Sequence, residues 1–162
     1  LITVAIDLQK FENILFLIIG EGVKKQKIEK LVAVSALKNV KLLPLQPSEM
    51  LPFSLSSGDL AYITLDHGAE RASVPSKLYY MLAAGCGILS VALENSELGI
   101  LTKKFNFGEI FEPGERKSIG NFILDCMLNK QKLIKFQQNA RYAALNFTPK
   151  NAELFYKKIV DA

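Results

Sequence analysis

The sequence predicts an α/β fold, with a Rossmann-like parallel sheet that has helices on both faces. Three observations support this prediction. Short apolar runs alternate with longer segments whose apolar residues recur at helical spacing. Several of the runs are apolar at consecutive positions, as in strands that are buried on both faces. The 162 residues suit a single domain with a core of ordinary size.

Each element follows from this alternation. The apolar runs that predict strands are residues 14–19, 40–43, 60–65, 87–92 and 108–111. The segments that predict helices are residues 2–10, 23–37, 47–56, 75–84 and 96–103, followed by helical periodicity from residue 115 to the end. Strand and helix therefore alternate through most of the chain, which is the pattern of right-handed βαβ units.

Capping residues mark the ends of several predicted helices. Ser73 is a candidate N-cap, Pro75 suits the first helical turn, and Gly85 suits a left-handed C-cap. Ser96 and Thr148 are candidate N-caps of two later helices. The segment Ser73-Val-Pro-Ser-Lys77 therefore predicts the start of a helix that ends at Ala83-Ala-Gly85.

The net charge and the cysteines indicate which partners and which cell compartment to expect. The net charge of +4 suits an anionic small ligand or an anionic membrane surface. The 20 Lys and Arg residues are spread along the chain, so nucleic acid is not expected as a partner. Cys86 and Cys126 have no metal-type spacing and predict free buried thiols in a reducing cytoplasm. His67 is the single histidine, which excludes a histidine-based metal site or triad.

The first candidate site is the turn Gly20-Glu-Gly22. In an open parallel sheet, ligands bind beyond the carboxyl ends of the strands, where loops meet helix N-termini. Glycines there let the backbone approach an anion such as a phosphate. A tight turn without a ligand explains this motif equally well. The dinucleotide fingerprint needs a third glycine where this chain has Lys25.

The second candidate is Lys77 in the first turn of its helix. A lysine there opposes the helix dipole at a cost of roughly a few tenths of a kcal/mol, unless it meets an anion. An ordinary solvated lysine is the alternative, and position alone favours it. In the preceding loop, Glu70, Arg71 and His67 could reach a sugar or a phosphate, although ordinary loop residues explain them as well.

These motifs together resemble the C-terminal, donor-binding domain of retaining GT-B glycosyltransferases of group 1. This family includes many capsule, O-antigen and lipopolysaccharide sugar transferases. The resemblance runs over residues 1–162, and Pro75-Ser-Lys77 with Ala83-Ala-Gly85 is its most specific part. The other segments that carry it are Ile18-Ile-Gly-Glu-Gly22, Asn39-Val-Lys-Leu-Leu43 and Ile88-Leu-Ser-Val91.

The resemblance implies a nucleotide-sugar-binding domain over residues 1–162, with the acceptor domain outside this chain. The substrate-binding residues that it implies are Gly20, Gly22, Leu45, Glu70, Ser73, Ser76, Lys77 and Tyr80. The glycine turn would lie against the diphosphate or the sugar, and the backbone around Leu45 would receive the base. No residue is assigned a catalytic role, and neither a cofactor nor a metal is expected.

The implied function is retaining transfer of a hexosyl group from a nucleoside diphosphate sugar to a glycan or lipid-linked acceptor. The implied setting is capsular or other cell-surface polysaccharide synthesis in the cytoplasm, with peripheral contact at the inner membrane face left open. The chain lacks an initiator Met and is expected to be a piece of a longer protein, inactive as an isolated domain.

One departure from the family motivates an alternative function. The family commonly has two glutamates eight positions apart, and the second holds the ribose hydroxyls. This chain has Ala72 and Tyr80 at those places, and Glu70 would serve only if the loop differs. The alternative is a non-catalytic Rossmann-like domain that binds a nucleotide or a protein partner.

Overall fold

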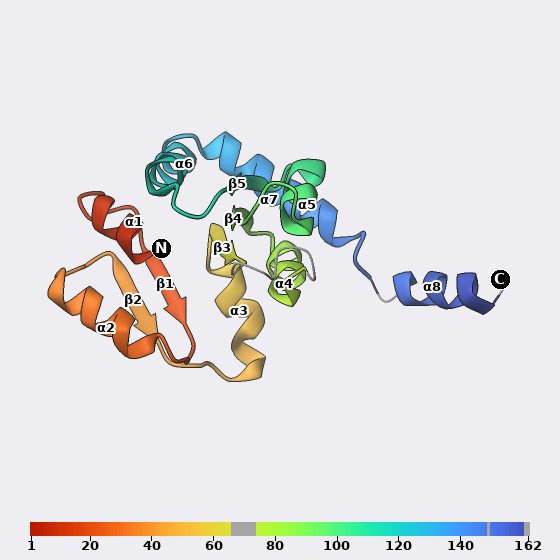
Figure 1. Ribbon diagram of the computed structural model, residues 1–162, viewed down its shortest axis with the longest axis horizontal. Coiled ribbons are helices and arrows are strands. Elements are labelled where there is room, and N and C mark those ends of the chain that lie inside the picture. Colours follow the sequence, from red (N-terminus) through yellow and green to blue (C-terminus); the bar gives the residue numbers. More distant parts are fainter. Residues whose placement is uncertain (66–73, 149, 161–162) are drawn as a thin grey trace.

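Parallel strands and covering helices form the structure (Figure 1), a computed structural model that describes residues 1–65, 74–148 and 150–160. The described residues form five strands, β1 (Phe16–Ile19), β2 (Val40–Leu43), β3 (Leu60–Thr64), β4 (Gly87–Val91) and β5 (Gly108–Phe111). β1 pairs with β2 in one sheet, and β4 lies between β3 and β5 in a second sheet. All of these pairings are parallel.

The helices follow the predicted order. They are α1 (Ile2–Asp7), α2 (Lys25–Val34), the 3₁₀ turn η1 (Ser48–Met50), α3 (Leu51–Ser56), α4 (Ser76–Ala84), α5 (Glu97–Phe105), α6 (Arg116–Leu128), α7 (Lys130–Ala144) and α8 (Lys150–Val160). α2 starts two residues later than predicted, and it ends earlier because Ala36 adopts a left-handed backbone, with a φ of 47°. The helical sequence after residue 115 breaks at Asn129, whose side-chain oxygen accepts the Lys132 amide at 3.1 Å and caps α7.

Two hydrophobic clusters cover the faces of the β3–β5 sheet. One cluster joins α1 and α6 to Phe16 of β1 and to Leu89 and Val91 of β4. The other lies on the opposite face, where α4, α5 and α7 contribute the fully buried Leu82, Leu98 and Ala140. All five residues of β4 are buried. The predicted fold class is therefore confirmed, with strands that are parallel and helices on both faces.

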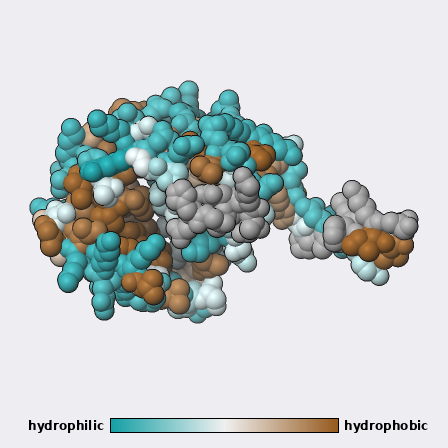
Figure 2. Space-filling model, in the orientation of Figure 1, coloured by the Kyte–Doolittle hydropathy of each residue, from teal (hydrophilic) through white to brown (hydrophobic). Residues whose placement is uncertain are grey.

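The division into two sheets and the exposure of β1 differ from the prediction. The pattern predicts one sheet and a β1 that is buried on both faces. Leu17 of β1 is instead 38% exposed, and the preceding Leu15 is 61% exposed. Ile28 and Val32 of α2 pack against the same cluster as Phe16, which leaves Leu17 at the surface. Figure 2 shows hydrophobic surface over the region of β1 and β2.

Polar contacts fix α7 against its neighbours. The Lys132 ammonium bonds Asp125 of α6 at 2.8 Å and Glu109 of β5 at 2.9 Å. These hydrogen bonds raise the pKa of Lys132, and its Nζ lies 5.4 Å from the centre of the Phe122 ring. Among the described helices, none is long and apolar enough to cross a membrane.

Both cysteines are expected to be unreactive in the folded protein. Cys86 and Cys126 are free and buried, and burial raises the pKa of the Cys126 thiol from 9.0 to about 11. At pH 8, a disulfide reagent such as DTNB should modify neither thiol until urea unfolds the protein, since the reactive thiolate is both scarce and covered. Modification of either thiol at the unfolded rate would contradict this expectation.

The raised thiol pKa also predicts a dependence of stability on pH. Between pH 9.0 and about 11 the unfolded Cys126 thiol releases its proton while the folded one keeps it. The free energy of unfolding should therefore fall as the pH rises through this window. Urea titrations at several pH values test this, and Cys126→Ala should weaken the dependence. An equal dependence in that variant would assign it to other groups.

Candidate functional site

A cavity of about 380 Å³ lies at the carboxyl ends of β1 and β2. Its apolar walls include Ile18, Leu42 and Pro44, and its polar side includes Glu21 and Lys24. The cavity lies where an open parallel sheet binds its ligands, between strand ends and the start of the following helix. The Gly20–Gly22 turn and the first turn of α2 form part of its lining.

Backbone conformation explains the two glycines in this turn. Gly20 has a φ of +135° and Gly22 a φ of +159°, which L-residues rarely adopt. A Cβ added at either position would meet no atom within 4 Å, so the backbone angles require glycine and crowding does not. The Gly20 amide donates to the Leu43 carbonyl at 3.1 Å. The turn therefore begins directly after the last β1–β2 hydrogen bond.

The charges that line the cavity balance, because Lys24 and Lys25 lie there with Glu21 and Glu29. Lys25 bonds both carboxylate oxygens of Glu21, at 2.7 and 2.8 Å, and the hydrogen bond to Glu21 raises the pKa of Lys25. This pairing neutralises the acidic residue of the turn. Lys24 remains in the lining, and α2 has no acidic residue in its first turn. The positive end of the helix dipole therefore faces the cavity, with Lys24 and Glu29 as the remaining charges of its lining.

The second group of predicted residues lies on α4, which starts later than the predicted cap implies. Pro75 is the N-cap residue, with an extended ψ of 126°, and Ser76 is the first helical residue. The Leu78 amide donates to the Pro75 carbonyl at 2.9 Å, which closes the first turn. The prediction that Pro75 lies inside the helix is wrong, because its ψ is not helical. Ser73 itself lies outside the described residues.

Ser76, Lys77 and Tyr80 are exposed on α4. Leu78 and Leu82 on the same helix are fully buried in the core, so helical geometry separates a buried face from an exposed one. Tyr80 is 58% exposed and presents a phenol where the resembled family has a carboxylate. α4 has no acidic residue in its first turn, so Lys77 opposes the dipole as predicted. Glu70, Arg71 and His67 lie outside the described residues.

Leu45 lies in the segment between β2 and η1. Its side chain is 72% exposed, and the side-chain nitrogen Nε2 of the neighbouring Gln46 donates to the Pro44 carbonyl at 2.9 Å. Pro44 lines the cavity. The backbone that is predicted to receive the base thus adjoins the cavity, and α3 continues from it toward α4. The Cys86 thiol donates to the Leu55 carbonyl of α3 at 3.1 Å, which joins these elements.

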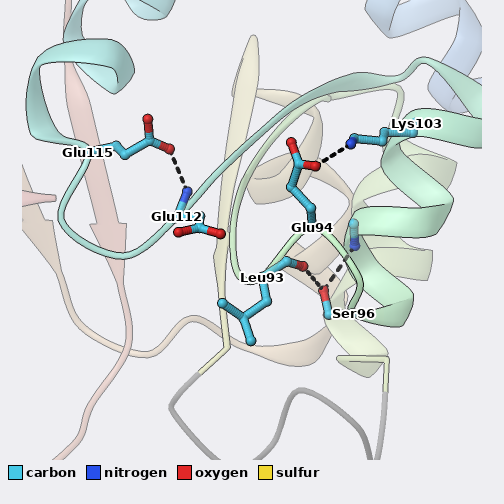
Figure 3. Close-up of polar contacts among 7 residues, drawn as sticks. Leu93, Glu94, Ser96, Lys103, Glu112 and Glu115 are labelled. Atoms are coloured by element: carbon cyan, nitrogen blue, oxygen red, sulfur yellow. Dashed lines mark hydrogen bonds and ion pairs between the residues drawn. The ribbon is translucent and has the colours of Figure 1, made fainter.

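The loop after β4 is occupied by local contacts, as Figure 3 shows. Ser96 accepts a hydrogen bond from the Gly99 amide at 3.1 Å and donates to the Leu93 carbonyl at 2.6 Å, which confirms it as the N-cap of α5. The Glu94 carboxylate pairs with Lys103 at 2.7 Å. This carboxylate is therefore already neutralised by a neighbouring lysine.

The structure brings some predicted residues together and keeps others apart. Gly20 and Gly22 border the cavity, whereas Ser76, Lys77 and Tyr80 form a separate exposed group on α4. Lys24 is a cavity residue that the sequence argument missed. The reasoning applied to Lys77, a lysine where a helix begins beside a strand end, would have found it.

Sequence comparison finds glycosyltransferases. The chain is 36% identical over 101 residues to WcaI of Escherichia coli K12, named as a colanic acid biosynthesis glycosyl transferase; the match covers 62% of this chain and 25% of the relative. It is 27% identical over 130 residues to the glycosyltransferase WbjE of Pseudomonas aeruginosa, covering 80% of this chain and 32% of the relative. No family model matches the chain.

Structure comparison confirms the fold. The C-terminal domain of a group 1 glycosyl transferase, LpcC of Francisella tularensis, matches with a TM-score of 0.70 at 16% identity, over 90% of this chain and 75% of that one. A Staphylococcus aureus TarM variant matches with a TM-score of 0.76 at 18% identity, over 94% and 30%. Anabaena HepE in complex with UDP-glucose matches with a TM-score of 0.70 at 18% identity, over 88% and 39%.

These comparisons confirm the resemblance to one half of a GT-B glycosyltransferase. The chain spans about a quarter to a third of the length of the two curated relatives. The match to the LpcC C-terminal domain covers most of both chains. The similarity therefore lies at the level of one domain.

Proposed function

We propose that this chain, which has the fold of one half of a GT-B glycosyltransferase, binds a nucleoside diphosphate sugar for transfer to a glycan or lipid-linked acceptor. The observation that carries this proposal is the cavity at the ends of β1 and β2, which is bordered by the Gly20–Gly22 turn and the start of α2. A phosphate group is one of the anions that such a turn and helix start can bind.

The charge distribution supports a role for the diphosphate as a leaving group. Breaking the bond to the sugar transfers negative charge to the diphosphate, and positive groups placed in advance stabilise that charge. Lys24 lies in the cavity lining, and Lys77 lies in the first turn of α4. We assign these lysines and the two helix N-termini to binding the diphosphate in a transfer that retains the configuration of the sugar.

The biosynthetic role of the protein and its place in the cell are also proposals. WcaI is named for colanic acid biosynthesis, and HepE was crystallised with UDP-glucose. By analogy, we propose a role in cell-surface polysaccharide synthesis, capsule included, in the cytoplasm or at the inner membrane face. Because the curated relatives are three to four times longer than their matched parts, an acceptor domain would lie in the remainder of such a protein.

A second candidate function is favoured by Tyr80. Its exposed phenol cannot accept two ribose hydroxyls as a carboxylate does. A domain that keeps the fold but has lost donor chemistry would bind a protein partner instead. The two functions differ in whether a nucleoside diphosphate binds at the glycine turn.

Calorimetric titration with uridine diphosphate and guanosine diphosphate separates these functions. We expect one of the two to bind saturably, and the matching monophosphate to bind about tenfold more weakly, because it lacks the second phosphate for the lysines. The monophosphate is the matched control, since it keeps the base and the ribose. If neither diphosphate binds, the donor-binding function is wrong and the non-catalytic function is supported.

A further inference from the structure

Arg141 of α7 holds the C-terminal end of α4. Its guanidinium donates to the Ala83 carbonyl, in the last turn of α4. Its side-chain carbons cover Gly85, because a Cβ added there would lie 3.1 Å from both Cγ and Cδ of Arg141. Gly85 has a φ of +80° and ends the helix in the left-handed conformation. A cation at this end also complements the helix dipole.

Phe147, which follows α7, holds α4 nearer its start. Its ring packs against Tyr79 with centroids 4.9 Å apart, and against Phe105 of α5 with centroids 5.9 Å apart. Tyr79 lies two residues after Lys77 on α4. The segment that comprises α7 and Phe147 therefore contacts α4 through an ionic group at one end and an aromatic ring toward the other.

These two contacts help to fix the direction of α4, together with its buried residues Leu78 and Leu82. α4 has nine residues, so it is a rod about 13 Å long. Its N-cap residue, Pro75, makes no side-chain capping bond. Leu78 and Leu82 hold one face of this rod against the core. The contacts at the C-terminal end and at the Tyr79 ring then set its direction on that core, and with it the place of Ser76 and Lys77.

We propose that Arg141 is a positioning residue for the donor site, acting through α4 to place Lys77 against the diphosphate. This inference rests on the proposed function. The guanidinium acts on the one helix that carries three of the proposed binding residues. Replacing Arg141 should therefore weaken ligand binding, which a loss of stability alone would not do.

The chain offers a matched control on the same helix. The Asn139 side chain donates to the Asn106 carbonyl at 2.7 Å, at the end of α5. Asn106 adopts a left-handed backbone, with a φ of 49°. Asn139 and Arg141 thus make the same kind of bond, from α7 to the end of a neighbouring helix, but only Arg141 bonds α4.

The test measures melting temperature and the Kd for uridine diphosphate and guanosine diphosphate. We expect Arg141→Ala and Asn139→Ala both to lower the melting temperature. Only Arg141→Ala should raise the Kd, by about fivefold, because a small displacement of a binding group weakens its contacts. Arg141→Lys should restore part of the affinity, since its ammonium can still donate to the Ala83 carbonyl.

A double-mutant cycle identifies the route of the effect. If Arg141 acts through Lys77, adding Arg141→Ala to Lys77→Ala should leave the Kd unchanged. If the alanine variant does not fold, Arg141→Gln replaces it in the same measurements, because glutamine keeps carbon atoms over Gly85. Equal Kd values for the Arg141 and Asn139 variants, or effects that add to Lys77→Ala, would overturn this inference alone. Absence of binding by the unaltered protein would overturn the proposed function as well.

Discussion

Gly108→Ala is expected to destabilise the protein by about 3 kcal/mol or more, because the added carbon has no space. A Cβ at Gly108 would lie 1.7 Å from the Ile88 carbonyl oxygen and 2.6 Å from its carbonyl carbon. The strand that would have to move is β4, which pairs with β3 on one side and β5 on the other. Urea unfolding followed by circular dichroism measures the loss.

Gly120→Ala is the matched control for this substitution. Gly120 is a buried glycine inside α6, and a Cβ there would meet no atom within 4 Å. Replacing it should raise the free energy of unfolding by about 0.5–1 kcal/mol, since alanine loses less backbone entropy in a helix. If Gly108→Ala stayed within about 1 kcal/mol of the unaltered protein, the packing of β5 against β4 described here would be wrong.

Lys77→Ala is expected to raise the Kd for the nucleoside diphosphate about tenfold, because an ammonium–phosphate contact is a charge-assisted hydrogen bond. The same substitution should raise the free energy of unfolding by roughly 0.3 kcal/mol, since it removes a cation from the positive end of a helix dipole. Weaker binding with higher stability is the combination that a ligand-contacting lysine predicts. Calorimetry and urea unfolding measure the two quantities.

Lys130→Ala provides the comparison for Lys77→Ala. Lys130 is an exposed lysine at the first position of α7, and it follows α6, which leads back from the carboxyl ends of the strands. Its removal should give the same small gain in stability with no change in affinity. Equal affinities for the two variants would show that Lys77 is an ordinary surface lysine, which is the alternative that its position alone favours.

The fold could be predicted from local patterns, whereas the division of its sheet could not. Consecutive apolar residues in β4 correctly predict burial on both faces. The run that forms β1 is apolar at every position, yet Leu17 is exposed. Whether a strand face is covered depends on which helices pack against it, and that is decided by contacts between distant segments. Periodicity within one strand carries no information about them.

The candidate site, too, could be predicted only in part. The sequence predicts a tight glycine turn after the first strand, and the structure has this turn at Gly20 and Gly22. The start of α4 at Ser76 was predicted only approximately, because the Pro75 backbone rather than a serine side chain provides the N-cap. The bond between Arg141 and Ala83 joins residues 58 positions apart. Such a contact leaves no sign in the local sequence of either residue.

Amide chemical shifts in a titration with uridine diphosphate and guanosine diphosphate show whether a diphosphate binds at the glycine turn. Nitrogen-15-labelled protein reports binding and location together, because each backbone amide gives its own signal. If this domain binds a donor diphosphate, the amides of Gly20, Gly22 and Ser76 should shift with one common Kd, while that of Lys130 stays unmoved. Saturating diphosphate that leaves the Gly20 and Gly22 amides unshifted would contradict the account.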